Sequence, residues 1–263
     1  MEEKFFSRHN LTFLLFELFR IQDLSENSYF EEFNKEALDM VLSTAAGIAV
    51  GLMRPQLRAM DKNPPVFKEG QVHVHPVVGE FSRACGEIGL ISAPFSFEDG
   101  GQQLPYTAMS ACNYIFSAAN YSLSVFPSLT AGAAGLIASF GTKEMKDYYL
   151  PKMFSGEWQG TMALTEPGAG SSLSDIKTKA MRTGEGYFRI SGTKVFISAG
   201  THDCTGNIVH LMLARVEDAP EGVKGISLFV VPKLRGDGRG GLEPNDITCT
   251  GIEHKLGYRG API

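Results

Sequence analysis

The first part of the chain alternates apolar and polar residues with the period of an α-helix. Over residues 33–52, apolar side chains recur three or four positions apart, which predicts one helix face packed against a core. Residues 59–80 are interrupted by proline and glycine and predict mostly loop. Residues 106–140 interleave small and large apolar residues and predict two or more buried helices, with breaks near Pro127 and Gly141. The predicted face consists of Phe33, Ala37, Val41, Ala45, Ile48 and Leu52.

The period shortens after residue 158. Residues 187–191 and 194–198 alternate around Gly192, which predicts a β-hairpin. Residues 208–215 and 226–231 are apolar and β-branched, which predicts two further strands.

These two periods together predict an α+β fold. We expect an all-α helical domain over residues 1–158, including an N-terminal extension over residues 1–32. A β domain over residues 159–263 is expected to follow it. Within the extension, the apolar stretch 11–16 predicts an amphipathic helix that docks onto a core or a neighbouring subunit.

Composition narrows the class of protein. Apolar residues make up 43% of the 263 residues and the net charge is −5, which is typical of a soluble globular protein and argues against a nucleic-acid partner. The cysteines are scattered, so we expect reduced thiols and no metal site. A cytoplasmic location is expected, because no signal peptide is evident and no apolar run approaches the ~20 residues of a membrane span. The cysteines are Cys85, Cys112, Cys204 and Cys249.

The stretch from Met162 to Ser172 is the strongest candidate for chemistry. A short predicted strand runs into a loop that contains Gly168, Gly170 and two serines. Such a loop can direct successive backbone N–H groups at an anion. The same composition is also ordinary turn material, so the loop is either an anion cradle or a plain turn.

This loop resembles the flavin-binding signature of the FAD-dependent acyl-CoA dehydrogenases. Further blocks follow the family pattern in the same order: residues 149–158, 175–180 and 192–200. The resemblance covers roughly residues 80–260 and implies a helical N-terminal domain followed by a β-barrel-like middle domain. The family's C-terminal helical bundle is expected to be absent from these residues.

A narrower resemblance is to the methylmercaptopropionyl-CoA dehydrogenase-like branch of the family. It rests on the N-terminal extension and on residues 207–211, 222–232 and 251–257. This branch handles several acyl chains, so the substrate's chain length is left open.

The resemblance implies roles for two groups of residues. The first group would lie along the flavin and its pyrophosphate, with Ser171 also touching the acyl-CoA; it comprises Met162, Leu164, Thr165, Gly170 and Ser171. The second group would cover the other flavin face, with Ser198 near the nitrogen that receives hydride; it comprises Phe196, Ile197 and Ser198. The family often has tryptophan in place of Phe196 and threonine in place of Ser198, and both replacements preserve the ring and the hydroxyl. An aromatic residue often occupies the place of Met162, and aspartate that of Ser172.

The implied reaction is α,β-dehydrogenation of an acyl-CoA thioester, with electrons passed to an electron-transferring flavoprotein. The family's glutamate base comes from its C-terminal domain, so the base is expected beyond residue 263. The family's dimers and tetramers complete the FAD site across subunits, which implies a homo-oligomer for the complete protein and weak FAD binding by this chain alone. Two alternatives stay open: a catalytically inactive FAD- or acyl-CoA-binding fragment or scaffold, and an acyl-CoA oxidase.

Other acidic and histidine side chains are weaker candidates for a catalytic base or a metal ligand. Glu166 lies inside the loop and is expected to orient it rather than act as the base, which would have to lie within about 3 Å of the proton it removes. His73 and His75 alternate but lack an evident third metal ligand, so surface or packing roles are expected. His202 follows the second block and could be near the site. Glu98 and Glu253 have no better claim as a base.

Overall fold

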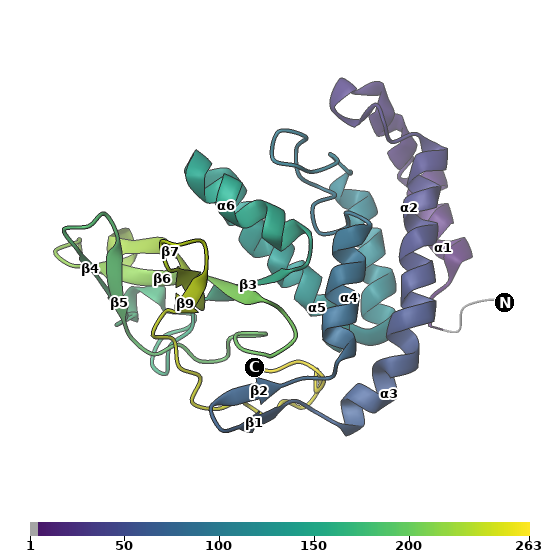
Figure 1. Cartoon of the computed structure of the whole chain (residues 1–263). Helices are drawn as coiled ribbons and strands as arrows, with labels where there is room; N and C mark the ends of the chain where they lie inside the picture. The colour runs from purple at the N-terminus through teal and green to yellow at the C-terminus, as the bar shows by residue number, and fades with distance from the viewer. Residues whose placement is uncertain (1–4) are drawn as a thin grey trace.

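The structure is a computed structural model that describes residues 5–263, and it places a helical part beside a curled mixed sheet (Figure 1). The predicted α+β fold class is confirmed, while the domain bounds at residue 158 stay a prediction. The helices are α1 (Arg8–Thr12), α2 (Lys35–Ile48), α3 (Arg54–Lys62), α4 (Val77–Glu87), α5 (Tyr106–Phe140) and α6 (Lys143–Phe154). Short π-helical segments, η1 (Phe13–Leu18) and η4 (Ala49–Met53), continue α1 and α2, and 3₁₀ turns follow η1 at η2 (Ile21–Glu26) and η3 (Ser28–Phe30).

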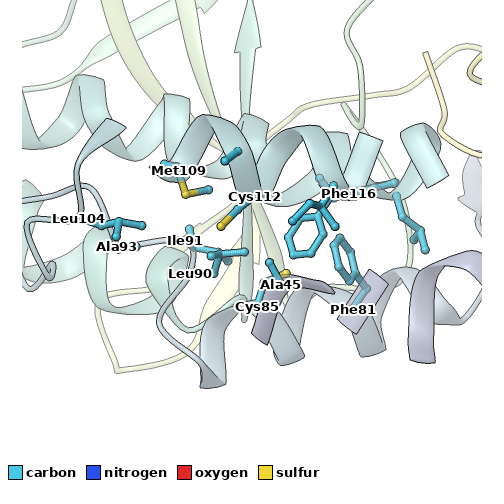
Figure 2. Close-up of a cluster of buried hydrophobic side chains, with 14 of the residues drawn as sticks. Ala45, Phe81, Cys85, Leu90, Ile91, Ala93, Leu104, Met109, Cys112 and Phe116 are labelled. Carbon is cyan, nitrogen blue, oxygen red and sulfur yellow. The ribbon is translucent and has the colours of Figure 1, made fainter. Parts of the chain in front are cut away.

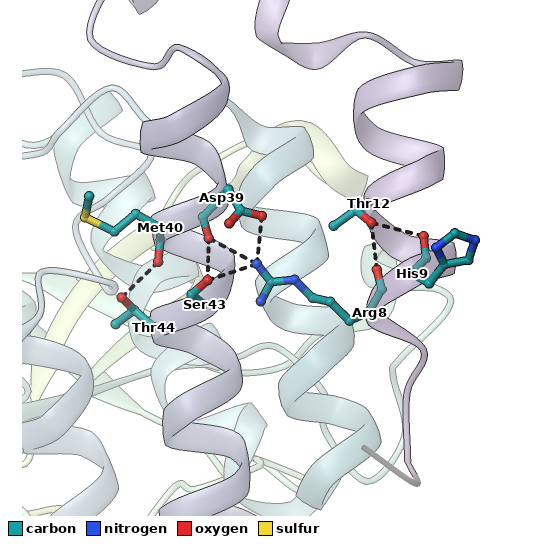
Figure 3. Close-up of polar contacts among 7 residues, drawn as sticks. All are labelled: Arg8, His9, Thr12, Asp39, Met40, Ser43 and Thr44. Atoms are coloured by element: carbon teal, nitrogen blue, oxygen red, sulfur yellow. Dashed lines mark hydrogen bonds and ion pairs between the residues drawn. The ribbon is translucent and has the colours of Figure 1, made fainter. Parts of the chain in front are cut away.

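The N-terminal extension docks onto α2. Ser7 caps α1 by accepting from the Asn10 N–H, and Leu11, Leu15 and Phe16 are buried. The Arg8 guanidinium donates to Asp39 Oδ1 at 2.8 Å and to Ser43 Oγ at 2.9 Å (Figure 3). The expectation of a docked amphipathic helix is therefore confirmed for residues 11–16.

The helix predicted over residues 33–52 exists, but its buried line is shifted from the predicted face. The most deeply buried residues are Leu38, Leu42, Ala45, Ala49 and Met53. Most of the predicted residues flank this line and are half-buried. The apolar stripe is wider than the predicted face, and the packing of α5 selects which line of residues becomes central.

Helix α5 is the packing centre of the helical part. Figure 2 shows Cys112 and Phe116 on α5 facing Phe81 and Cys85 on α4, and the rings of Phe81 and Phe116 meet edge to face at 5.6 Å. The break in α5 lies at Asn120 (φ −162°, ψ 94°), whereas Pro127 is accommodated inside the helix. The buried Asn120 amide donates to the Met53 carbonyl oxygen and its oxygen accepts from the Leu123 N–H, which holds the kink in place. The predicted break near Pro127 is therefore wrong.

Two stretches, Lys35–Lys62 and Tyr106–Phe140, are long and apolar enough to cross a membrane by length and composition alone, which corrects the expectation that no run approaches this limit. In this fold, 50% of the most apolar window of the second stretch is buried against other elements.

Residues 59–80 contain more regular structure than the loop predicted there. Helix α3 extends to Lys62, strands β1 (Val66–Lys68) and β2 (Gln71–His73) form an antiparallel hairpin, and α4 begins at Val77. Glu69 and Gly70 at the turn have positive φ (52° and 77°), a geometry that two-residue hairpin turns favour. The prolines flank these elements instead of interrupting them, so the loop prediction is wrong here.

The sheet is built around the long strand β6 (Asn207–Val216). Strand β3 (Trp158–Ala163) runs parallel to its first half, β4 (Lys179–Arg182) runs parallel to its end, and β7 (Ile226–Pro232) is antiparallel along its other edge. Strand β5 (Phe188–Ser191) pairs with β4. The predicted strands over 208–215 and 226–231 are confirmed, and a small hairpin follows them: β8 (Leu234–Gly236) and β9 (Leu242–Pro244).

The hairpin predicted around Gly192 is wrong. Strand β5 pairs with the preceding strand β4, and residues 194–198 form no strand. Phe196 and Ala199 have left-handed backbone (φ 59° and 52°), which does not continue an extended strand. A Cβ at Gly192 would lie 2.3 Å from Thr178 Oγ1 and 2.8 Å from its Cα, so glycine is required there by close packing rather than by a turn.

The helical part and the sheet meet where α5 crosses β3. The Gln159 side chain donates to the Phe126 carbonyl oxygen at 2.9 Å, and the Gly160 N–H donates to Thr130 Oγ1 at 3.1 Å. A Cβ at Gly160 would lie 2.7 Å from the Ala133 side chain, so only glycine allows this approach. The contact fixes the start of the loop that follows β3.

Candidate functional site

The loop after β3 is a tight turn stabilised by its own backbone. The Glu166 N–H donates to the Ala169 carbonyl oxygen at 2.8 Å, and the Ala169 N–H donates back to Glu166 at 3.2 Å. A Cβ at Gly168 would meet nothing within 4 Å, whereas one at Gly170 would touch the Thr165 methyl at 3.4 Å. The loop surface is therefore open at Gly168, while a side chain at residue 170 would be in ordinary van der Waals contact with Thr165.

Glu166 ties this loop to the rest of the sheet part. Its carboxylate is buried and accepts from the backbone N–H groups of Lys177 (2.6 Å) and Thr178 (3.0 Å), from the Thr178 hydroxyl, and from the Lys194 ammonium (2.8 Å). Burial by itself would raise the pKa of Glu166, but these hydrogen bonds, led by that from Lys194, lower it to about 2. The carboxylate is ionised and fully occupied, so it orients the loop as expected and is not available as a base.

Lys194 joins the two sequence blocks. Besides its bond to Glu166, its ammonium donates to the Leu164 carbonyl oxygen at 3.1 Å. The next residue, Val195, donates its N–H to the Thr165 carbonyl oxygen at 2.9 Å. Blocks that are about 30 positions apart in the sequence are therefore bonded side by side.

The predicted flavin-contacting residues are gathered around this junction. Leu164 and Thr165 belong to its first side and Gly170 packs against Thr165, while Phe196 to Ser198 continue directly from its second side. Of these residues, Ser171 and Phe196 are exposed and the others are half-buried, as is Met162 on β3. The structure brings the two groups together; their contacts with a flavin stay predictions.

A C-terminal segment, residues 252–263, lies against the second block. The Lys255 ammonium lies 4.1 Å from the centre of the Phe196 ring, and the Ala199 N–H donates to the Pro262 carbonyl oxygen at 2.8 Å. Burial raises the pKa of Tyr258 to about 12, against the effect of a hydrogen bond with Ser198. This segment, together with Pro64 and Pro65 just before β1, lines a cavity of about 290 Å³ whose wall includes Lys255 and Arg259. The sequence patterns did not indicate this cavity.

The fit to FAD can be judged from these residues. The turn at 166–169 leaves an open surface at Gly168, and Ser171, which follows it, is exposed. Phe196, an aromatic residue, is 51% exposed. An anionic pyrophosphate and a flat, half-polar ring require surfaces of these kinds, so the residues present are compatible with the cofactor.

His73, His75 and His202 each have a structural partner. His73 Nδ1 lies 2.7 Å from Asp203 Oδ2, and His75 Nδ1 accepts from the Val77 N–H. His202 is buried, accepts from the Cys204 N–H and packs edge to face on Phe126. Across residues 5–263, no three metal-ligating side chains lie close enough to hold an ion.

His210 is a buried polar residue that the sequence patterns missed. Its Nδ1 lies 2.7 Å from Thr161 Oγ1, across the parallel pair β3 and β6. Burial, reinforced by the charge of Lys233, lowers the pKa of both His210 and His202 to about 4, so both are neutral at pH 7. The apolar pattern predicts the strand over residues 208–215, but it does not indicate that the histidine within this strand is buried.

Comparison with known protein families decides the identity of this fold. The acyl-CoA dehydrogenase N-terminal domain matches residues 35–157, and the acyl-CoA dehydrogenase middle domain matches residues 161–263. The chain belongs to the acyl-CoA dehydrogenase family. The family resemblance drawn from the two sequence blocks is thereby confirmed.

Individual relatives support the same assignment. The chain is 46% identical over 177 residues to 3-methylmercaptopropionyl-CoA dehydrogenase of Ruegeria pomeroyi, covering 67% of this chain and 30% of that protein. It is 37% identical over 245 residues to a butyryl-CoA dehydrogenase of Syntrophomonas wolfei, covering 90% and 40%. The crystal structure of an acyl-CoA dehydrogenase complexed with FAD from Bacillus anthracis shares the fold, with a TM-score of 0.66 at 24% identity over 88% of this chain and 35% of that one.

The chain spans 30% to 40% of the length of these two curated relatives. The matched family regions are the N-terminal and middle domains alone.

Proposed function

We propose that this chain forms the flavin-binding part of an FAD-dependent acyl-CoA dehydrogenase. The observation that carries the proposal is the bonded junction between the loop after β3 and residues 194–198, because it assembles both predicted flavin-contacting groups in one place. Bound FAD would supply the hydride acceptor for α,β-dehydrogenation of an acyl-CoA thioester.

The residues of this chain would bind FAD and orient it toward the acyl-CoA. The exposed Ser171, the turn that is open at Gly168, and Gly170 would receive the pyrophosphate, with Ser171 also reaching the acyl-CoA. Backbone groups of Leu164 and Thr165 would hold the pyrimidine edge of the ring, where donors favour the reduced flavin. Phe196 and Ser198 would cover its other face.

Removal of the α proton needs a base that this site does not supply. Glu166 is the acidic residue of the loop, but four hydrogen bonds hold its carboxylate and its pKa is about 2. A carboxylate so weakly basic and so enclosed cannot accept a proton from substrate at neutral pH. We therefore propose that the base and the contact with an electron-transferring flavoprotein lie outside these residues.

Anaerobic spectroscopy tests the proposal. The chain saturated with FAD is mixed with butyryl-CoA and with 3-methylmercaptopropionyl-CoA while the flavin absorbance is recorded. A shifted flavin spectrum without bleaching is the expected result, since thioester binds but its α proton stays in place. Bleaching by this chain alone would show that it contains a base, and failure to bind FAD at all would overturn the proposal.

The same experiment addresses a second candidate, an FAD- or acyl-CoA-binding piece without activity of its own. The enclosed state of Glu166 favours this candidate. Adding a separately expressed C-terminal domain of a relative discriminates between the two: restored bleaching supports the catalytic role, and continued absence of bleaching supports the binding role.

A further inference from the structure

Lys194 occupies an unusual position for a lysine. Its side chain is 8% exposed and the Glu166 side chain is 6% exposed, so both members of the ion pair are removed from water. Lysine is rarely buried unless it is paired, because an isolated ammonium in a dry site is strongly unfavourable. The pair therefore stays closed, and salt will screen it far less than a surface pair.

The bonds of Lys194 reach both predicted flavin-contacting groups. The ammonium holds the Leu164 carbonyl oxygen at 3.1 Å and the Glu166 carboxylate at 2.8 Å. These acceptors lie on either side of Thr165, whose own carbonyl oxygen is held by the Val195 N–H. Two neighbouring residues of the second block thus hold three successive residues of the loop, through the backbone carbonyl groups of Leu164 and Thr165 and the side-chain carboxylate of Glu166.

A second set of bonds fixes the far side of the carboxylate. Glu166 also accepts from Lys177 and Thr178 N–H groups, and Thr178 packs against Gly192. Removal of the ammonium leaves these bonds in place but frees the Leu164 carbonyl group. Loss of the Lys194 ammonium therefore disturbs the backbone that is predicted to contact the flavin, while the other bonds of Glu166 remain. A residue that only supports the fold would not have this local effect.

We propose that Lys194, paired with Glu166, is a positioning residue that sets the FAD affinity of this site. The proposal rests on the proposed function, since it presumes that residues 164–171 bind FAD. It predicts that breaking the pair weakens FAD binding by more than any loss of folded protein explains.

The test compares four variants with the unaltered chain. Lys194→Met removes the ammonium and retains an unbranched apolar side chain, and Glu166→Gln removes the opposing charge. The double variant carries both changes and leaves no unpaired charge, so it guards against simple misfolding. Lys179→Met is the matched control, because Lys179 is an exposed lysine on neighbouring strand β4.

Two measurements are made on each variant: FAD titration by flavin fluorescence, and hydrogen–deuterium exchange of residues 164–171 without FAD. Lys194→Met is expected to bind FAD at least about tenfold more weakly and to exchange faster in the loop. The double variant should recover thermal stability yet keep the weakened FAD binding, since the bond to Leu164 is still missing. Lys179→Met should match the unaltered chain in both measurements.

The outcomes separate this proposal from the proposed function. If the unaltered chain binds FAD and the folded double variant binds it equally well with unchanged loop exchange, the role of Lys194 is overturned and the flavin site stands. If the unaltered chain does not bind FAD, both are overturned.

Discussion

Around helix α5, positions are fixed by apolar burial, whereas around the loop after β3 they are fixed by a few buried polar contacts. Phe81, Cys112 and Phe116 are at most 1% exposed and each touches several neighbours of similar kind. The loop depends instead on the pair of Glu166 and Lys194 and on a few further hydrogen bonds around it. Apolar packing is non-directional and spreads over many contacts, while a buried ion pair depends on both partners. The helical part is therefore held by many similar contacts, so the loss of one leaves others in place. The candidate site is held by a few specific contacts, each of which matters.

The largest expected effect is a loss of stability when the apolar packing around α5 is disrupted. Phe116→Ala removes a ring packed edge to face on Phe81 and should lower the free energy of unfolding by about 3–5 kcal/mol. FAD affinity of the folded variant should be unchanged, since the Phe116 ring packs on Phe81 of α4 and makes none of the bonds that hold the loop. Urea denaturation and FAD titration measure the two quantities. Phe140→Ala, at an 80% exposed position of the same helix, should change stability by less than about 0.5 kcal/mol.

The next largest effect is a loss of stability at low pH, caused by two buried histidines in the sheet part. Burial, together with the Lys233 charge, lowers the pKa of His202 and His210 from 6.5 to about 4, with Asp203 opposing the shift for His202. Between these two values the unfolded chain binds more protons, so stability is lost as pH falls from about 6.5 to about 4. Each histidine contributes on the order of 3 kcal/mol to this loss.

Urea denaturation across that pH range checks the expectation. His210→Gln should make the profile less steep, whereas His9→Gln at an exposed position should leave it unaltered. A His210→Gln profile as steep as that of the unaltered chain would show that His210 does not titrate as described.

A smaller difference in stability is expected between alanine substitutions at two glycines of the sheet part. A Cβ at Gly192 would collide with Thr178, so Gly192→Ala should cost about 1–3 kcal/mol of stability. Gly168→Ala meets open space and should change stability by less than about 0.5 kcal/mol. Thermal unfolding of the two variants checks this; equal melting temperatures would mean that residue 192 does not pack as the structure has it.

The same contrast explains which features could be predicted from the sequence. The helix over 33–52 and the strands over 208–215 and 226–231 follow from apolar periodicity, because burial creates that periodicity. The strand predicted over 194–198 alternates as well as any other. In the structure Lys194 pairs instead with Glu166, a contact between residues 28 positions apart that no local pattern encodes, and the backbone turns left-handed at Phe196.

Breaks and turns were also hard to predict. Proline is the usual marker of a helix break, yet Pro127 stays inside α5 and the kink falls at Asn120, whose side chain finds buried partners on Met53 and Leu123. The positions of the candidate site residues were predicted by family resemblance to two ordered blocks. The cavity beside Lys255 and the buried His210 were not, since each arises only when distant segments meet.

The most direct test of the central claim is a titration of this chain with FAD, followed by flavin fluorescence. If the loop after β3 and residues 194–198 form the flavin site, binding is saturable and one-to-one, with a Kd on the order of 10 μM. Gly170→Val, which adds a branched side chain to the loop proposed to receive the pyrophosphate, should abolish it. Absence of saturable binding, or equal binding by Gly170→Val, would contradict the account.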